Sequence, residues 1–537
     1  MINADNKFCL IKNALDGKRY ALYRDGDLIR ILYAEGLVSG MGIGEVTLVD
    51  NNVITASLLL SGWNQEITAD ETLTGVAPLV VHFDGAETVH SSVDGFLDLF
   101  YHWDFGYTST ASQSVWGTTA LLKGQQIGGP IAAHCFEKAG TYPCSVRIQD
   151  AFGAYVDRYF TVIVRLADDY YSAGNTICIS KAGDFTGAPS GATTTTTPPT
   201  AVTSDTRYLY RAGEDYSTST LSIAHSKSKV LIGSFGSGSK PKVWHKLVQT
   251  PPKTTDTLLN SVTFMDLNVN DMDIPFGDYI SFIRCDSFDQ GASDPYVAGC
   301  GETVAYYYNN PPASTNLSDI KWPKNSAWVS NTIDGNLVTG NAVGIRGNRP
   351  ILLGNDIKDP SEHDVRVHLA YKLFMSHNLL GTVSNNTKTH LKFHAKGTGT
   401  FTEDYGSSPN PGSKYSVVSD NYNSEDSANW IMALAPQNNS STELVSYIIM
   451  ERNQFLYASG DTAAKVFHIL SGQNLCVRDY TLSGTVTVRR AVGFDAHSQA
   501  IGIGTLSPYF VPAGNPYIDG SRIFTATGVV TPFKAGT

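Results

Sequence analysis

Cysteine, charge and long apolar runs are all scarce in this chain of 537 residues. The seven cysteines are widely spaced, and neither a Cys-x-x-Cys pair nor a Cys/His cluster with zinc spacing occurs, which excludes the common zinc modules. No run of about 18 apolar residues is present, so we expect no membrane span. The Gly-x-Ser-x-Gly elbow, the Walker loop and the His-Glu-x-x-His motif are missing too, so no specific catalytic signature identifies a reaction.

Charged residues make up 17% of the chain, below the average of about 25% in soluble domains. The formal net charge of −11 argues against a nucleic-acid backbone as the main partner. Sustained helical periodicity is absent, whereas glycine, threonine, asparagine and tyrosine are plentiful. The composition therefore predicts an all-β protein of roughly two to four domains.

The first 65 residues have the pattern of a small β unit. Arg19–Tyr33 predicts two strands around the turn Asp25-Gly26, and Asn52–Leu60 predicts a further strand. We interpret residues 1–65 as a docking or connecting domain, and the alternative is an extra layer on the unit that follows. The segment Met1–Lys7 lacks a basic region followed by an apolar one, so we do not expect a secretory signal.

Residues 66–166 have the pattern of a β-sandwich. Trp103 and Phe105 alternate as on the buried face of a strand. Gly140 allows a tight turn, after which we expect Tyr142, Ser145 and Arg147 on one face of a strand and Val146 and Ile148 on the other.

The stretches Tyr101–Gly106, Phe136–Gly153 and Thr74–Gly85 resemble the PKD domain, a small sandwich of adhesins, secreted carbohydrate enzymes and some virion proteins. The chain departs from that family at Tyr107-Thr108, where an acidic residue and a glycine are common. The resemblance implies a module that positions or binds. Cys135 and Cys144 flank one turn of this unit and are either partners or two buried thiols in a reduced compartment.

From about residue 175 the pattern changes to short strands separated by turns rich in glycine, asparagine, aspartate and serine. Strands are predicted at Val230–Gly236, Val262–Val269, Tyr279–Arg284, Val365–Leu369, Leu373–Asn378, Leu391–His394, Tyr415–Asn421, Tyr447–Asn453, Val466–Leu470 and Val486–Arg489. Several end in an asparagine, namely Asn378, Asn421 and Asn453, and asparagines can stack in ladders at the bends of a parallel β-helix. We expect about 10–14 coils of roughly 20–35 residues over 175–537, and the alternative is a row of sandwiches.

The segments Ile177–Gly187, Tyr208–Tyr216, Trp430–Asn438 and Ile449–Phe455 resemble the right-handed parallel β-helices of surface-polysaccharide enzymes and phage tailspikes. The predicted fold class is therefore all-β: a small N-terminal β unit, a PKD-like sandwich and a right-handed parallel β-helix.

Three groups of residues are candidates for chemistry or binding. Glu443 and Glu451 represent an acidic group that also contains Asp404, Asp420, Glu425 and Asp426, and a glycoside hydrolase needs two such carboxyls. Arg366 and His368 share one side of a strand, as do Lys392 and His394, and a polysaccharide lyase needs a cation and a base. For both groups the alternative is an ordinary solvated polar face.

The aromatic group consists of Tyr306, Tyr307, Tyr308, Trp322 and Trp328, in a loop excursion over 285–350. Aromatic faces stack on sugar rings, so we predict carbohydrate contact here, with a loop that packs its own rings as the alternative. The nearby Asp286, Asp289 and Asp294 offer weak calcium ligands without the spacing of an EF-hand loop, and no other metal or cofactor is expected.

The resemblances imply a virion surface protein of a bacteriophage, such as a tail fibre, tailspike or capsid decoration, that attaches to bacterial surface polysaccharide. Its N-terminal region would contact other virion subunits, and the chain would form a homotrimer. A virus particle also accounts for a surface-type module without an export signal, with an extracellular location as the alternative. The alternative functions are a polysaccharide lyase or glycoside hydrolase and a purely structural fibre.

Overall fold

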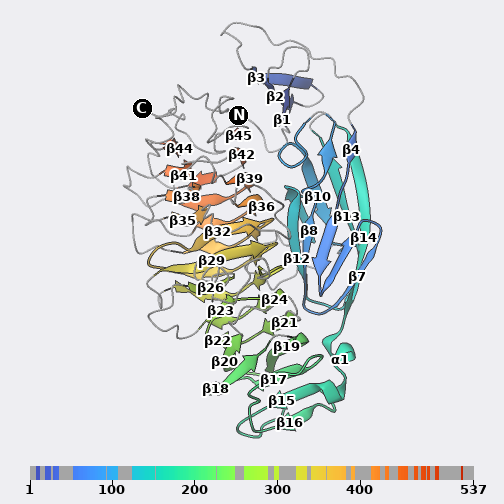
Figure 1. Cartoon of the computed structure of the whole chain (residues 1–537), viewed down its shortest axis with the longest axis vertical. Coiled ribbons are helices and arrows are strands. Elements are labelled where there is room, and N and C mark those ends of the chain that lie inside the picture. Colours follow the sequence, from blue (N-terminus) through green and yellow to red (C-terminus); the bar gives the residue numbers. More distant parts are fainter. Residues whose placement is uncertain are drawn as a thin grey trace, which may run out of the picture.

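Figure 1 shows a computed structural model of the chain. The structure describes residues 8–12, 19–25, 28–34, 53–91, 93–106, 124–150, 153–224, 226–247, 259–287, 296–300, 322–335, 340–358, 360–381, 389–393, 413–423, 430–434, 445–456, 465–469, 473–478, 481–483, 490–494 and 522–523. Within these ranges the protein is almost entirely β, as its composition predicts.

The first sheet is an antiparallel meander that contains the hairpin predicted around Asp25 and one further strand. Its strands are β1 (Phe8–Lys12), β2 (Arg19–Asp25) and β3 (Leu28–Ala34). Asp25 pairs with Leu28 at the hairpin end, so the predicted hairpin is confirmed.

The next unit is a two-sheet sandwich. One sheet has the order β11 (Gln125–Gly128), β10 (Phe100–Asp104), β13 (Gly140–Gln149), β14 (Tyr155–Arg165) and β7 (Thr72–Val76). The other has the order β12 (Ile131–Phe136), β8 (Leu79–Asp84), β5 (Leu59–Gly62) and β6 (Gln65–Thr68). A short pair, β4 (Ile54–Thr55) and β9 (Val89–His90), lies beside them. Because β5 pairs with β8, this sandwich includes residues before position 66.

The sandwich core confirms the predicted alternation of Trp103 and Phe105, which are 1% and 3% exposed. The expected facing of Tyr142 is wrong, because Tyr142 is buried on the same face of β13 as Val146 and Ile148. A regular strand of ten residues leaves no break between these positions, so even-numbered residues share one face.

Cys135 and Cys144 are both buried and free. They lie on β12 and β13, in different sheets. Cys144 belongs to the sandwich core, whereas Cys135 faces outward onto the neighbouring stack of coils. The alternative of two buried thiols is therefore the one the structure supports.

The linker consists of α1 (Ala167–Tyr170) and the 3-10 turn η2 (Ala173–Asn175), and after it the chain forms a parallel β-helix. Each full coil contributes one strand to each of three columns, which we call A, B and C.

Column A contains β15 (Thr176–Ile179), β17 (Arg207–Arg211), β19 (Ser228–Phe235), β21 (Asn260–Met265), β24 (Asp278–Ile283), β27 (Ala327–Val329), β30 (Ile351–Leu353), β33 (Phe374–Ser376), β36 (Lys414–Ser419), β39 (Ser446–Glu451), β42 (Gln473–Arg478) and β45 (Arg522–Ile523). β16 (Thr193–Thr195) pairs with β15 in the first coil.

Column B is a ten-stranded parallel sheet. It contains β18 (Asp215–Ile223), β20 (Lys242–Leu247), β22 (Asn268–Val269), β25 (Asp286–Ser287), β28 (Thr332–Asp334), β31 (Asp356–Lys358), β34 (Leu379–Leu380), β37 (Tyr422–Asn423), β40 (Gln454–Leu456) and β43 (Thr481–Ser483).

Column C contains β23 (Met272–Ile274), β26 (Tyr296–Cys300), β29 (Asn341–Asn348), β32 (Val365–Tyr371), β35 (Thr389–Phe393), β38 (Trp430–Leu434), β41 (Lys465–Ile469) and β44 (Arg490–Phe494). Each predicted strand that falls on described residues is present, and Val486–Arg489 lies outside them.

An asparagine ladder lies at the bend between columns A and B. It contains Asn331, Asn355, Asn378, Asn421 and Asn453, which follow one another at intervals of 24, 23, 43 and 32 residues. Each side-chain amide donates to the side-chain carbonyl of the next asparagine at 2.9–3.0 Å. The predicted stacking of Asn378, Asn421 and Asn453 is thereby confirmed.

Each coil also places one residue in the left-handed region before the ladder and one at the start of its column A strand. Those before the bend are Asp266, Arg284, Ser330, Gly354, His377, Asp420 and Arg452, with φ between 51° and 67°. Those at the strand start, which we call the sandwich column, are Lys229, Ser261, Tyr279, Asn325, Arg349, Lys372, Tyr415, Tyr447 and Asn474, with φ between 51° and 60°.

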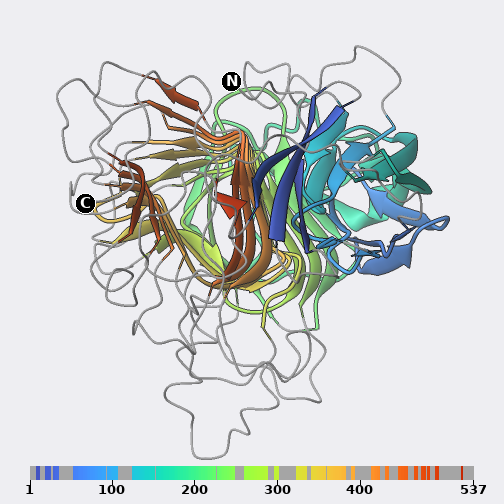
Figure 2. The same ribbon diagram turned by 90° about the horizontal axis from the view of Figure 1, so that it is seen from above.

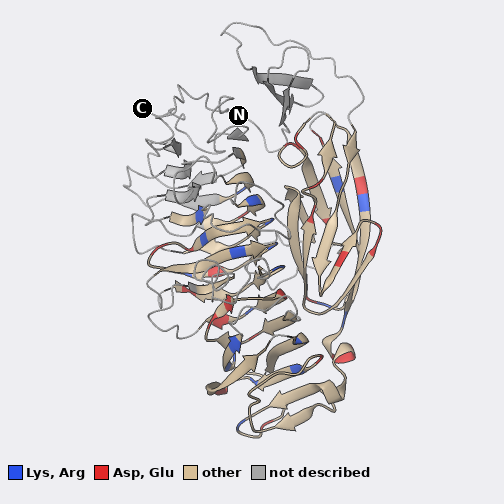
Figure 3. Ribbon diagram, viewed as in Figure 1, with Lys and Arg blue, Asp and Glu red and all other residues tan. Residues whose placement is uncertain are grey.

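The sandwich lies alongside column A, as the two views in Figures 1 and 2 show. Its outer apolar side chains, among them Phe96, Ile131 and Cys135, form one buried cluster with Ile351 and Phe374 of the stack. The chain therefore passes down the sandwich, reverses at α1 and builds its coils back along the same sandwich. Most of the ribbon in Figure 3 is uncharged, and Lys372 and Arg284 each form an ion pair between the two parts.

Candidate ligand groove at the junction

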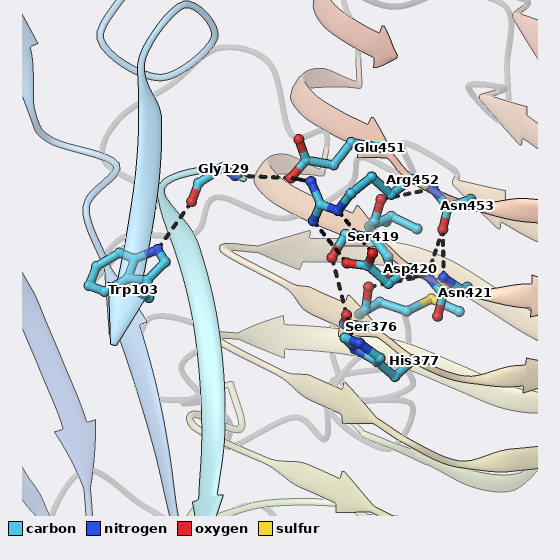
Figure 4. Close-up of polar contacts among 12 residues, drawn as sticks. Trp103, Gly129, Ser376, His377, Ser419, Asp420, Asn421, Glu451, Arg452 and Asn453 are labelled. Atoms are coloured by element: carbon cyan, nitrogen blue, oxygen red, sulfur yellow. Dashed lines mark hydrogen bonds and ion pairs between the residues drawn. The ribbon is translucent and has the colours of Figure 1, made fainter. Parts of the chain in front are cut away.

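The predicted acid Glu451 serves the contact between the sandwich and the stack. It is 1% exposed, and its Oε1 accepts a hydrogen bond from the Gly129 backbone nitrogen at 3.0 Å (Figure 4). The Gly129 carbonyl in turn accepts from the indole nitrogen of Trp103 at 3.3 Å. Arg452 holds Asp420 of the neighbouring coil through two bonds of 2.9 and 2.8 Å. Glu451 is thus committed to structure, and Glu443 lies outside the described residues.

A second polar contact is centred on Lys372. Its ammonium lies 2.7 Å from Asp84 and 3.3 Å from Glu87, both in the sandwich part. The neighbouring Arg349 pairs with Glu66. His82 is fully buried beside them and bonds the Lys372 carbonyl oxygen at 2.8 Å. Burial lowers the pKa of His82 to about 4, so this imidazole is neutral at physiological pH.

The predicted lyase group is only partly assembled. Arg366 of β32 and Lys392 of β35 are paired in register on adjacent strands, and both are half-buried. His368 is 4% exposed and lies where the register between β29 and β32 shifts, so it does not share the accessible face of Arg366. His394 lies outside the described residues.

The predicted aromatic site loses Trp328. This residue is fully buried in the β-helix core, and its indole nitrogen donates to the Met272 carbonyl at 2.9 Å. A strand residue that points into the coil has no face left for a sugar. Trp322 is half-buried, and Tyr306, Tyr307 and Tyr308 lie outside the described residues.

Two further findings concern metal ions and membrane spans. No group of three or more His, Cys, Asp or Glu among them could hold a metal ion. Asp286 forms an ion pair of 2.7 Å with Lys240, and Asp289 and Asp294 fall outside the described ranges. In the same part of the chain, no helix is both long and apolar enough to cross a membrane.

A groove of about 370 Å³ lies where the sandwich, the linker and the early coils meet. It is lined by Trp63, Asn64, Gln65, Thr74, Gly75, Val76, Arg165, Tyr170 and Lys229. The first six belong to the turn between β5 and β6, to the start of β6 and to β7, whereas Arg165 ends β14, Tyr170 ends α1 and Lys229 lies on β19. All three parts of the chain therefore contribute to one concave surface.

The tip of this groove is a two-residue hairpin turn between Gly62 and Gln65. Its central residues, Trp63 and Asn64, have φ of 47° and 62°, as a type I′ turn requires. Asparagine tolerates this region, whereas a bulky residue pays about 1–2 kcal/mol for it. Tryptophan at this position is therefore held against its backbone preference.

The turn is anchored to the groove walls. The Asn64 side-chain oxygen accepts from Asn260 at 3.0 Å, and the Gln65 side-chain oxygen accepts from the Thr74 backbone nitrogen at 2.8 Å. The Gln65 carbonyl accepts from the Tyr279 hydroxyl at 3.3 Å. The side-chain amide nitrogens of Asn64 and Gln65 have no partner among the described residues and remain available as donors.

Two aromatic rings meet in the groove. Trp63 and Tyr170 lie edge to face, with 5.7 Å between ring centroids and an interplanar angle of 88°. The Tyr170 hydroxyl donates to Asp205 at 3.1 Å. Burial, followed by that hydrogen bond, raises the pKa of Tyr170 to about 12, so the phenol is neutral. The groove thus offers half-buried aromatic surface next to free amide donors, which is the composition of a site for a polar organic ligand.

Sequence reasoning missed this groove. Its residues are far apart in the chain, and only the way the sandwich packs against the stack brings them together. The sole local signal is Gly62-Trp63-Asn64-Gln65, in which an asparagine between two strands indicates a tight turn.

No protein-family model and no curated protein matches this chain. Among solved structures, two of the surface adhesin PfbA of Streptococcus pneumoniae are similar: one at 10% identity over 55% of this chain and 78% of that chain with a TM-score of 0.33, the other at 9% over 55% and 85% with 0.35. The periplasmic alginate epimerase AlgG is similar at 10% identity over 62% of this chain and 76% of that chain, with a TM-score of 0.25. Similarities this low carry no argument about what the chain binds or does.

Proposed function

We propose that this chain is an attachment protein that binds polysaccharide at a bacterial surface. The proposal rests on the groove between the sandwich, the linker and the early coils, which we call the junction groove. In it the rings of Trp63 and Tyr170 lie beside the free amide nitrogens of Asn64 and Gln65. Aromatic rings cover the apolar face of a sugar, and amide groups bond its hydroxyls. A volume of about 370 Å³ falls within the usual range of small-molecule sites.

The strained turn supports the same proposal. Other bulky residues with left-handed backbone, Tyr415 and Tyr447, stack on each other with 4.8 Å between centroids and pack against Phe96 of the sandwich part. Trp63 packs against the sandwich core and against the apolar cluster of the first coils, but it is only half-buried and also lines the groove. Residues with strained backbone occur preferentially at binding sites.

The location of the protein is a further part of the proposal. The resemblance of 66–166 to PKD domains and of 175–537 to tailspike coils favours the surface of a phage virion, with a homotrimer as the assembled form. The molecular mass of the purified protein in solution tests the trimer directly, and labelling of intact virions tests the location.

The groove is tested by titration of purified protein with oligosaccharides prepared from bacterial surface polysaccharides. We expect Trp63→Gly to reduce binding at least roughly 10-fold. Glycine relieves the strained turn but also removes the packing of the indole on both apolar clusters, so the unfolding midpoint is measured alongside to confirm that the variant is folded. Tyr159→Ala is the matched control, since this tyrosine is 59% exposed on the sandwich sheet that does not face the stack. Equal binding by wild type, W63G and Y159A would contradict the proposal.

A lyase activity is the second candidate. The observation that favours it is the registered pair of half-buried cations, Arg366 and Lys392, on the outer face of column C. The same oligosaccharides, followed by ultraviolet absorbance of unsaturated products, distinguish cleavage from binding. Loss of that absorbance in Lys392→Met would assign the activity to this pair.

A further inference from the structure

The cations of the junction groove differ from the other cations between the sandwich and the stack. Lys372, Arg349 and Arg284 each bind at least one carboxylate across that contact. Arg165 and Lys229 line the groove and form no ion pair with any described residue. The groove of a chain with a formal net charge of −11 thus presents two positive charges that no described carboxylate pairs with.

The position of the two cations suits an anion held against the aromatic rings. Arg165 is exposed at the end of β14, and Lys229 is half-buried at φ 54° on β19. Their backbones are fixed, because the Arg165 carbonyl accepts from the Ala77 nitrogen at 3.0 Å and the Lys229 carbonyl accepts from the Tyr171 hydroxyl at 3.2 Å. The ligand therefore meets cations whose main-chain positions are already set.

Two acidic residues next to the groove residues are bound to other groups. Asp205 accepts the hydroxyl hydrogen of Tyr170 at 3.1 Å and makes no ion pair with Arg165 or Lys229. Glu66, on the strand that follows the turn, pairs with Arg349. Both carboxylates are thus engaged by other partners, and neither forms an ion pair with Arg165 or Lys229.

We infer that the groove binds an acidic sugar unit of the uronic acid class, with the ring against Trp63 and the carboxylate between Arg165 and Lys229. The planar guanidinium offers two parallel N–H groups to a carboxylate, and the ammonium adds a point charge. The free amides of Asn64 and Gln65 bond the hydroxyls. This inference rests on the proposed function and names the substrate class of the same site.

The experiment compares an oligogalacturonate with its carboxyl-reduced form, by titration into the full chain. We expect the acidic oligomer to bind at least roughly 10-fold more tightly, because charge-assisted hydrogen bonds exceed neutral ones. Arg165→Gln and Lys229→Gln should each remove most of that preference while the reduced oligomer binds as before. Lys246→Gln, an exposed lysine on β20 away from the groove, should change neither affinity.

The outcomes separate the two proposals. If both oligomers bind equally and Trp63→Gly weakens both, the sugar site stands and the acidic specificity is wrong. If neither oligomer binds, both proposals are wrong. Binding of poly-glutamate as tight as that of oligogalacturonate would show that the groove recognises an acidic peptide, which also overturns this inference. Retained preference in Arg165→Lys, together with its loss in Arg165→Gln, would support it further.

Discussion

Two regions of the stack both contain left-handed backbone but differ in the side chains that accompany it. The bend between columns A and B and the start of column A each require a left-handed residue in every coil. At the bend, the residue that follows is asparagine in five coils, because each amide bonds the next. The sandwich column instead varies among tyrosine, asparagine, arginine, lysine and serine. A residue type that recurs from coil to coil therefore indicates contact between coils. A residue type that changes from coil to coil indicates contact with the sandwich, which has no repeat.

The largest expected effect lies in the sandwich column. Lys372→Ala leaves Asp84, which is 3% exposed, with only the more distant Arg349 at 3.9 Å, and should destabilise the protein by about 3 kcal/mol. Denaturant unfolding measures this loss. The double variant Asp84→Asn with Lys372→Met should lose much less, since no buried charge remains unpaired. A loss of unfolding free energy no greater than that of the exposed control Lys246→Ala would show that the sandwich column does not stabilise the contact with the sandwich.

The next effect is a pH dependence at the same contact. The pKa of His82 is about 4 in the folded protein and 6.5 in an unfolded chain, so the unfolded state binds the proton first as pH falls. Stability is unaffected above pH 6.5 and decreases between pH 6.5 and 4, by on the order of 3 kcal/mol from this group.

Burial is the main cause of that low pKa, followed by the opposing influence of Asp84 and the supporting influence of Arg349. His82→Asn removes the titrating group, so its unfolding free energy should fall less steeply over this pH range. Unfolding midpoints of wild type and H82N, measured side by side, test the expectation. Parallel curves for the two proteins would show that His82 does not titrate here.

The ladder provides the third prediction. Asn378→Ala leaves the buried Asn355 backbone nitrogen and side-chain amide without their acceptor and should cost about 2 kcal/mol. The exposed Thr220→Ala on β18 is the control and should lie within about 0.5 kcal/mol of wild type. The free energy of unfolding checks both. A neutral N378A would mean that the amide stack follows from the fold and contributes little to it.

The smallest effect is expected beside the ladder. Asp420→Asn weakens the pair with Arg452, whose side chain is 30% exposed, so water screens the lost charge. We expect a loss of under about 1 kcal/mol, which decreases further in high salt. A loss larger than that of Asn378→Ala would reverse the ranking of the two regions.

The sequence predicted those features that depend on neighbours of the same kind. The asparagines at 378, 421 and 453 indicated the ladder because an amide that stacks on an amide repeats in the chain. Asn331 and Asn355 belong to the same ladder, but Asn331 follows β27 inside the segment 285–350 that was predicted to be a loop excursion, and Asn355 follows β30 directly after it, so neither strand was predicted. Trp328 was assigned to a binding loop for the same reason, although it is the middle residue of β27 and fully buried.

The junction groove was beyond such reasoning. Trp63 and Lys229 become neighbours because the sandwich is applied along column A in one particular orientation. That orientation is fixed by side chains such as Lys372 and Glu451, which look like ordinary surface charges in the sequence. Ion pairs between the sandwich and the stack do not recur at a regular interval, so the sequence contains no periodic pattern that would reveal them.

The position of the sandwich ahead of the stack has a consequence for synthesis on the ribosome. The sandwich is synthesised before the stack, yet the hydrogen bond of Gly129 cannot form until Glu451, 322 residues later in the chain, has been translated. During that interval the outward side chains of β12, Ile131, Ala133 and Cys135, face water. This exposed apolar surface makes the nascent chain prone to aggregation. It also gives each newly synthesised coil a folded surface to pack against, so the coils can form in the order in which they are translated.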